Sequence, residues 1–239
     1  MNGNLTMMTD LYQLTMLYGY HKQGMSNRRA VFYMFYRPAE GLNYAVAAGM
    51  AQLRDYINDL RFEEEDISYL RSLRLFDEDF LAALRDFRFT GDISAVREGD
   101  FIFPGEPIVR VDAPLYQAQL IETALLNLVG HQTLIATKAN RVVRAAEVDA
   151  VMEFGLRRAQ GPDAGVLGAR AAVIGGCGST SNVLAGQLFG MPVSGTHAHS
   201  WVMSFDSEID AFRAYANCFP EKTLLLVDTY DTLRSGVPN

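Results

Sequence analysis

The chain has 239 residues, of which 49% are hydrophobic and 21% are charged, and its formal net charge at pH 7 is −7. These proportions are ordinary for a globular protein, and the length allows one large domain or two small ones. The negative charge argues against a nucleic-acid partner, because nucleic-acid phosphates would be repelled. A small anionic substrate remains compatible with it, since a few arginines and backbone amides can hold an anion.

The two cysteines, Cys177 and Cys218, are far apart and form no Cys-x-x-Cys motif. A disulfide framework is therefore not expected, and a reducing cytoplasm is the predicted location. Residues 1–6 have neither the basic nor the apolar region of a signal peptide. No apolar run approaches the roughly 18 residues that a membrane span requires, so no membrane partner is expected.

Residues 1–115 are predicted to form an amino-terminal α+β domain. Asp10, after Thr9, is typical of a helix start, and Gly24 marks the predicted end of that helix. The aromatic run 31–36 favours a strand.

The rest of this predicted domain alternates helices with a hairpin. Apolar residues at helical spacing predict a second helix from Val46 to Leu60. Residues 63–88 are charged and predict short helical pieces with a solvated face. Two apolar runs flank Pro104–Gly105, which predicts a hairpin over residues 101–111.

Residues 116–239 are predicted to form part of an irregular α/β barrel. Pro114 opens a long helical stretch that runs to about Ala146, with Gly130 as a candidate interruption. Short strands then alternate with helices, which favours a parallel sheet or barrel. The expected strands are 151–155, 192–195 and 223–229, and the expected helices are 165–174, 181–189 and 208–216. A complete barrel of this class needs roughly 250 residues, so we expect a partial one.

Polar clusters follow each of the three expected strands, at residues 154–158, 195–200 and 228–231. In parallel α/β architectures, functional groups gather at the carboxyl ends of strands. Any one cluster is equally compatible with a solvated loop. Three of them together favour a shared pocket.

The first cluster carries Phe154, Arg157 and Arg158. A guanidinium group binds a carboxylate or a phosphate in a bidentate fork, although a surface ion pair is the common alternative. Phe154 is a core aromatic by default, but beside two cations it could stack against a flat substrate ring.

The second cluster carries His197 and His199, which would share one face of a strand. Two such histidines are compatible with a metal pair, and a histidine is equally able to carry a phosphoryl group. Thr196 and Ser200 add hydroxyl groups. In the third cluster Asp228 and Asp231, which flank Tyr230, could hold Mg²⁺ together with substrate oxygens or cap the following turn.

A glycine-rich segment, residues 175–182, precedes an expected helix. Its amides and hydroxyls could cradle an anion at the helix start, and a helix cap with tight packing is at least as compatible with the sequence. It is not a P-loop, because the Gly-Lys-Ser/Thr ending is missing. Cys177 is expected to be a small packed residue.

Eight segments occur in the order seen in nicotinate phosphoribosyltransferases, and together they extend over nearly the whole chain. They are residues 9–15, 99–107, 120–127, 132–138, 154–161, 180–186, 195–205 and 227–232. The chain therefore resembles the amino-terminal half of that family. Eight ordered motifs are far more specific than any single one.

The resemblance implies an enzyme that joins nicotinate to phosphoribosyl pyrophosphate, which yields nicotinate mononucleotide and pyrophosphate for NAD biosynthesis. It implies ATP as a co-substrate through a transient phosphohistidine, and Mg²⁺ bound with phosphoribosyl pyrophosphate or ATP. It also implies an α/β barrel beside a smaller α+β domain and a head-to-tail homodimer with a shared active site.

Roles for individual residues also come from the resemblance. His199 matches the phosphorylated histidine. Contacts to nicotinate are implied for Tyr12, which would reach the partner subunit's site, and for Phe154, Arg157 and Thr196. Positions near the phosphoribosyl group and Mg²⁺ are implied for Asp228, Asp231, Arg158 and Ser200. No direct protein metal site is predicted.

Two features depart from the family pattern. Gly178 stands where many relatives have an acidic residue, which puts that contact in doubt. Relatives also continue for about as long again, so we expect residues 1–239 alone to bind substrates incompletely and to turn over little or not at all. The alternatives are a nicotinamide or quinolinate phosphoribosyltransferase, a metal-dependent barrel hydrolase that uses His197 and His199, and a non-enzymatic binding fragment.

Overall fold

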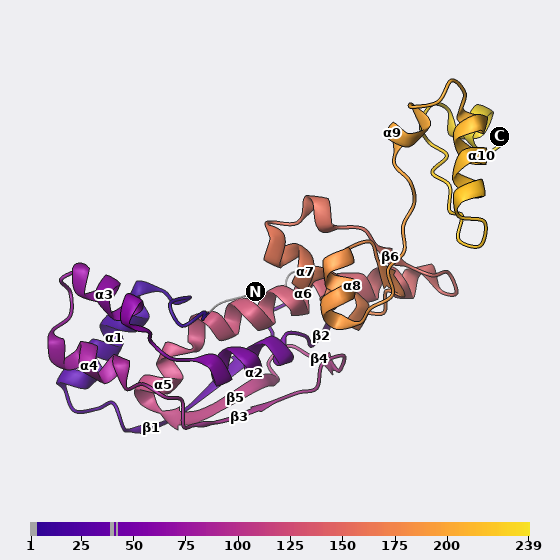
Figure 1. The fold of residues 1–239 in the computed structure, drawn as a ribbon. Coiled ribbons are helices and arrows are strands. Elements are labelled where there is room, and N and C mark those ends of the chain that lie inside the picture. Colours follow the sequence, from indigo (N-terminus) through magenta and orange to yellow (C-terminus); the bar gives the residue numbers. More distant parts are fainter. Residues whose placement is uncertain (1–3, 39–40, 42) are drawn as a thin grey trace.

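The computed structural model describes residues 4–38, 41 and 43–239. Figure 1 shows an elongated molecule in which α1, α3 and α4 lie at one end, α6 runs along the middle, and α9 and α10 lie at the other end. Helices and short strands are mixed, as the sequence predicted.

The amino-terminal part contains, in chain order, α1 (Leu11–Lys22), β1 (Arg29–Phe35), β2 (Ala45–Val46), α2 (Met50–Asp59), α3 (Glu64–Ser72), α4 (Glu78–Arg85), β3 (Asp92–Ala95), β4 (Phe101–Ile102) and β5 (Pro107–Pro114). The remaining part contains α5 (Leu115–Leu120), α6 (Glu122–Ala146), β6 (Met152–Glu153), the 3₁₀ turn η1 (Leu156–Arg158), α7 (Pro162–Ile174), β7 (Ser179–Thr180), α8 (Val183–Phe189), α9 (His199–Val202), α10 (Glu208–Cys218) and the π-helical turn η2 (Thr232–Gly236).

The main sheet is antiparallel, with strand order β1-β5-β3, and β2 pairs with β4 in a separate two-stranded sheet. The predicted hairpin over residues 101–111 is therefore wrong. Its two runs do flank a turn, in which Gly105 has a φ of 82°. They join different sheets because β5 is long enough to pair along both its edges, and this tertiary pairing overrides the local hairpin signal.

The predicted second helix begins later than expected, because Val46 lies in β2 and α2 begins at Met50. In addition to its pairing with β4, the backbone of β2 and of the residues that follow it is hydrogen-bonded by side chains of α6. The hydroxyl of Thr137 accepts the backbone N–H of Val46 at 2.9 Å, and the hydroxyl of Thr133 contacts both backbone groups of Ala48 at 3.2 Å. Helix α6 thereby satisfies a buried strand edge.

The long helical stretch is interrupted at Ile121, between α5 and α6, and Gly130 lies inside α6. The candidate interruption at Gly130 is therefore wrong. A single glycine costs a helix only about 1 kcal/mol, which the buried face of a 25-residue helix easily outweighs.

Strands in the second part are shorter than expected. Strands β6 and β7 pair in parallel, and Thr180 makes a parallel bridge to Val193. The predicted strand 192–195 is thus reduced to one bridge. Residues 223–229 form no strand in the part of the chain that the structure describes. A strand needs a neighbour for its backbone groups, and this segment instead packs its Leu225 and Val227 against the α9–α10 cluster.

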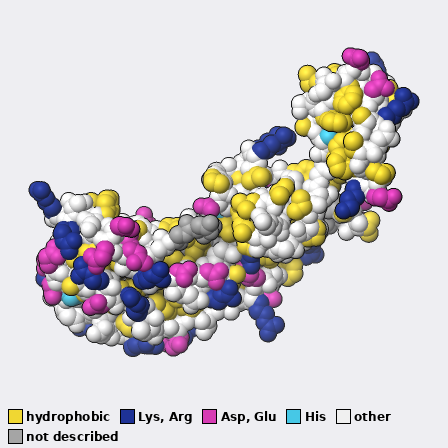
Figure 2. All heavy atoms as spheres, viewed as in Figure 1, with side chains coloured by type: hydrophobic (Ala, Val, Ile, Leu, Met, Phe, Trp, Pro, Cys, Tyr) yellow, Lys and Arg dark blue, Asp and Glu magenta, His cyan; other side chains and the backbone are white. Residues whose placement is uncertain are grey.

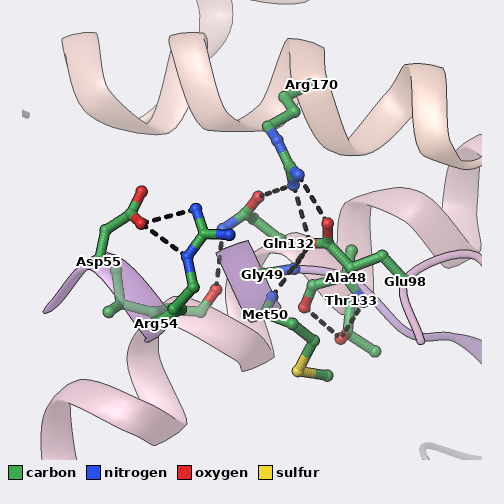
Figure 3. Close-up of polar contacts among 10 residues, drawn as sticks. Ala48, Gly49, Met50, Arg54, Asp55, Glu98, Gln132, Thr133 and Arg170 are labelled. Atoms are coloured by element: carbon green, nitrogen blue, oxygen red, sulfur yellow. Dashed lines mark hydrogen bonds and ion pairs between the residues drawn. The ribbon is translucent and has the colours of Figure 1, made fainter. Parts of the chain in front are cut away.

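A polar joint connects the amino-terminal sheets to α7 (Figure 3). The Glu98 carboxylate accepts the backbone N–H groups of Gly49 and Met50 at 2.7 and 3.0 Å, and it accepts both Nη groups of Arg170 at 2.9 and 2.6 Å. Arg170 also donates to Gln132 of α6 at 3.2 Å. Burial works against the charge on Glu98, but the bonds from Arg170, Gly49 and Met50 outweigh it and lower the pKa of this carboxyl.

The surface differs from one end of the molecule to the other (Figure 2). Charged side chains crowd the end that carries α3 and α4, whereas hydrophobic side chains are prominent over α8 and the α9–α10 end. Exposed examples are Val183, Leu184, Leu188, Met203 and Leu233. Among the described residues, no helix combines the length and the apolar character that crossing a membrane requires.

Candidate functional site

The first polar cluster lies on the turn that joins β6 to η1. Phe154 is 42% exposed, and Arg157 and Arg158 are exposed on η1. The turn is closed by a backbone bond of 2.9 Å from Arg158 N–H to Gly155 O. An aromatic ring and two guanidinium groups are thus presented to solvent together, as a flat anionic ligand would require.

The glycine-rich segment uses its amides internally. The backbone N–H groups of seven residues donate to acceptors within the chain, and these residues are Gly175, Gly176, Cys177, Gly178, Thr180, Ser181 and Asn182. The Asn182 side chain caps α8 by accepting the Ala185 N–H at 3.1 Å. The segment therefore has the features of a helix cap and not of an anion cradle. As predicted, Cys177 is packed, and burial together with the nearby Glu153 charge raises its pKa.

Gly178 lies in open space. A Cβ atom built there meets nothing within 4 Å, and its φ is not in the left-handed region. Packing therefore does not require glycine at this position.

His197 is a packed residue with 8% of its surface exposed. Its ring centroid is 4.8 Å from that of Tyr215 in an edge-on contact, and its Nε2 accepts the backbone N–H of Leu226 at 3.3 Å. His199 begins helix α9, so the two histidines do not share the face of a strand. This geometry favours a core role for His197 over a metal-binding role.

His199 lies beside the segment that carries Asp228. Its Nδ1 is 3.3 Å from the hydroxyl oxygen of Thr229, and its Nε2 is 3.9 Å from a carboxylate oxygen of Asp228. The side chains of His199 and Asp228 are 51% and 63% exposed. One ring nitrogen is therefore held by a hydroxyl, while the other faces a carboxylate at the surface.

Three other predicted site residues have local roles. The Asp231 carboxylate accepts the backbone N–H groups of Leu233 and Arg234, at 3.1 and 2.9 Å, and so caps η2. The Thr196 hydroxyl donates to the carbonyl of its neighbour His197 at 2.8 Å. Ser200 is exposed, and its carbonyl accepts the Ser204 hydroxyl at 2.6 Å.

The predicted site residues do not all meet. His199 and Asp228 lie together, whereas no contact between them and Phe154 or Arg157 is found among the described residues. Figure 1 shows α9 set apart from β6 and α7, at the far end of an extended segment. Tyr12 lies on α1, at the opposite end of the molecule, and is 48% exposed.

Two polar residues at this site escaped the sequence reasoning. Thr229 adjoins Asp228, and Glu153 precedes Phe154. Both stand next to residues that were singled out, but nothing in the sequence reveals that Thr229 faces the His199 ring or that the Glu153 carboxylate accepts from Gly155 and Thr180. Among the residues that the structure describes, no three His, Cys, Asp or Glu side chains gather closely enough to hold a metal ion.

Comparison with known proteins identifies the family. Residues 7–130, more than half of the chain, match the family model described as the nicotinate phosphoribosyltransferase (NAPRTase) amino-terminal domain. The chain belongs to the nicotinate phosphoribosyltransferase family. A Bacillus subtilis protein named nicotinate phosphoribosyltransferase is 48% identical over 240 residues, which cover 100% of this chain and 49% of that protein. The chain thus spans about half the length of the curated relatives it matches.

Solved structures agree with this family assignment. The crystal structure of human nicotinic acid phosphoribosyltransferase superposes with a TM-score of 0.86 at 36% identity, over 96% of this chain and 56% of the human chain. A nicotinate-nucleotide pyrophosphorylase from Pyrococcus furiosus has a TM-score of 0.73 at 22% identity, over 95% of this chain and 51% of that one, and shares the fold. The predicted mixed α/β fold of the nicotinate phosphoribosyltransferases is therefore confirmed.

Proposed function

We propose that the protein carries the phosphohistidine half of an ATP-coupled nicotinate phosphoribosyltransferase that serves NAD biosynthesis in the cytoplasm. The observation that supports this most is the arrangement of His199 between Thr229 and Asp228. An exposed histidine with one nitrogen fixed and the other accessible is what a phosphoryl carrier requires.

The Thr229 hydroxyl determines which nitrogen reacts. If it accepts the proton of Nδ1, Nε2 keeps its lone pair and is the nucleophile. Nε2 attacks the γ-phosphorus of ATP, so that an N–P bond forms while the P–O bond to ADP breaks. The hydrogen bond from Nδ1 to Thr229 then stabilises the positive charge that develops on the ring.

Asp228 fits a place beside the phosphates. Mg²⁺ is commonly held by one or two carboxylates plus substrate phosphates, so a dedicated cluster of protein ligands is not needed. The exposed Asp228 carboxylate, 3.9 Å from Nε2 of His199, offers a protein oxygen ligand to such an ion. The ion supplies charge neutralisation for phosphoryl transfer when it is bound.

Phe154 and Arg157 are suited to nicotinate itself. The exposed ring of Phe154 offers a face for the flat pyridine, and the Arg157 guanidinium matches a carboxylate in a bidentate geometry. We assign Thr196 as a further nicotinate contact, and Arg158 and Ser200 to the phosphoribosyl side. Tyr12, in the first turn of α1, would act in the site of a partner subunit in a homodimer.

Phosphoryl transfer tests the central assignment. The full chain is incubated with Mg²⁺ and ATP labelled in the γ-phosphate, and alkali-stable protein phosphate is counted. We expect labelling of the parent chain and of the control His21→Ala, whose ring lies on α1 and pairs with Asp79. His199→Ala should lose the label. Equal labelling of His199→Ala, or none in the parent chain, would overturn the proposal.

Substrate choice is tested separately by competition. Nicotinate, nicotinamide and quinolinate are compared as ligands of the parent chain and of Arg157→Gln. Nicotinate should bind best, and Arg157→Gln should reduce the preference for nicotinate over nicotinamide, since nicotinate, unlike nicotinamide, carries a carboxylate for the guanidinium. A stronger interaction with nicotinamide or quinolinate would assign the protein to that neighbouring activity. Metal analysis of the same sample tests the hydrolase alternative, which stoichiometric Zn²⁺ would favour.

A further inference from the structure

The turn that carries Phe154 and Arg157 is clamped by the side chain of Glu153. One carboxylate oxygen, Oε1, accepts the backbone N–H of Gly155, and the other, Oε2, accepts the hydroxyl of Thr180 at 2.6 Å. Strands β6 and β7 place Glu153 directly opposite Thr180 in the parallel register. The same side chain therefore fastens the turn both to itself and to the neighbouring strand.

The clamp continues into the interior. The Thr180 side chain is fully buried, and its oxygen accepts the backbone N–H of Asn182 at 3.0 Å. Asn182 in turn donates to Gly165 O of α7 at 3.2 Å and caps α8. An exposed turn is thus tied through Glu153 to two helices, which restricts its motion.

Gly155 is part of the same arrangement. A Cβ atom at Gly155 would lie 2.8 Å from Oε1 of Glu153. Because that oxygen is the far end of a side chain, an alanine here would displace the carboxylate without a backbone collision. The absence of a side chain at Gly155 is therefore what lets the carboxylate reach the N–H group.

We propose that Glu153 is a positioning residue, which holds the Phe154–Arg157 turn in the conformation that receives nicotinate. This inference rests on the proposed nicotinate site. Both carboxylate oxygens are already engaged by donors of the chain, so Glu153 acts through the turn and not on the substrate. Its hydrogen bonds matter more than its charge, because a glutamine can still accept from Gly155 and can donate to the remaining lone pair of the Thr180 oxygen, although the Thr180 hydroxyl hydrogen then loses its acceptor.

Three variants separate this role from others. Glu153→Ala removes both bonds, Glu153→Gln keeps the bond from Gly155 and reverses the one with Thr180, and Gly155→Ala pushes the carboxylate away. Nicotinate binding is followed by ligand-observed NMR titration of the full chain. We expect about tenfold weaker binding for Glu153→Ala and Gly155→Ala, the factor that corresponds to the loss of a hydrogen bond worth ~1.4 kcal/mol, and a smaller loss for Glu153→Gln, which keeps the bond from Gly155. The double variant Glu153→Ala/Gly155→Ala should bind nicotinate no more weakly than either of its two single variants, because both changes remove the same contact.

Amide hydrogen exchange of residues 152–158 provides a readout that does not depend on the ligand. Exchange should be faster in Glu153→Ala and Gly155→Ala and should change less in Glu153→Gln, which keeps the bond from Gly155. Parent-like exchange and binding in Glu153→Ala would overturn the inference, as would a loss of binding in Glu153→Gln as large as in Glu153→Ala. If the parent chain bound no nicotinate, the proposed nicotinate site would fail, and the exchange measurement alone would decide whether the clamp exists.

Discussion

The two ends of the molecule differ in how they bury apolar surface. The amino-terminal part, together with α5 and the first half of α6, encloses one continuous core that includes fully buried Phe80 and Phe87. The α9–α10 end has a small apolar cluster whose buried members, among the described residues, are Val202, Ala211 and Phe212. Since burial of apolar area is the main stabilising term, most of the stability should reside at the amino-terminal end. His199 and Asp228 lie at the weaker end, where local opening costs least.

The sharpest test of this contrast is a matched pair of core truncations. Phe80→Ala should destabilise the main unfolding transition by about 3–5 kcal/mol, because it leaves a cavity in the continuous core. Phe212 is only 3% exposed, but it lies in the small cluster. Phe212→Ala should therefore change the free energy of the main transition by less than ~0.5 kcal/mol. Urea unfolding followed by far-UV circular dichroism measures both. Equal losses would show that the two ends unfold as one unit.

The joint at Glu98 and Arg170 belongs to the strong part of the molecule. Arg170→Met removes one member of a bidentate pair whose side chains are only 15% and 21% exposed, and it should cost about 3 kcal/mol by leaving the Glu98 charge without its partner. Arg213→Met is the control at the other end. Its 3.9 Å pair with Asp210 is exposed, so the change should stay below ~0.5 kcal/mol. The same urea titration compares the two variants, and similar costs would contradict the contrast.

Acid should act on the same joint. The pKa of Glu98 is lowered in the folded chain, so its ionised form contributes stability that is fully present above the ordinary carboxyl pKa and is lost as the pH falls through the lowered value. The midpoint of urea unfolding should therefore decrease more steeply on acidification in the parent chain than in Glu98→Gln. The effect should be smaller than that of Arg170→Met, because a protonated Glu98 can still accept hydrogen bonds. Parallel pH profiles would show that Glu98 does not contribute.

A different contrast, between local and long-range signals, explains which sequence predictions succeeded. Helices such as α1, α7 and α10 were predicted close to their observed bounds, because capping and spacing are local signals. The hairpin over residues 101–111 and the strand over residues 223–229 failed, because strand pairing depends on partners far away in the sequence.

The site followed the same rule. The sequence pointed to His199 and Asp228 separately, and they do lie together. It could not reveal that Thr229 holds the ring or that Glu153 fastens the preceding turn, since both depend on side-chain direction. His197 had the same residue type and the same motif as His199, yet it is packed against Tyr215. Only the three-dimensional neighbours distinguish the two.

The smallest predicted effect tests the helix that connects the two ends. Gly130 lies inside α6, its φ is ordinary, and a Cβ atom there meets nothing within 4 Å. Gly130→Ala should therefore stabilise the chain by about 0.5–1 kcal/mol, because alanine loses less backbone entropy in a helix. Gly49→Ala is the opposite case. Gly49 has a φ of 99°, and its Cβ would lie 2.5 Å from Leu128 O, so this variant should be less stable than the parent.

Thermal unfolding of the parent chain and the two glycine variants measures the difference. A rise in midpoint for Gly130→Ala with a fall for Gly49→Ala is expected. A fall for Gly130→Ala would mean that α6 bends at this residue. The hydrogen bonds that Thr137 and Thr133 make to Val46 and Ala48 would then depend on the flexibility of this glycine. The connection between the sheets and the second part of the chain would then be a hinge, and the contrast between the two ends would originate in α6 and not in their cores.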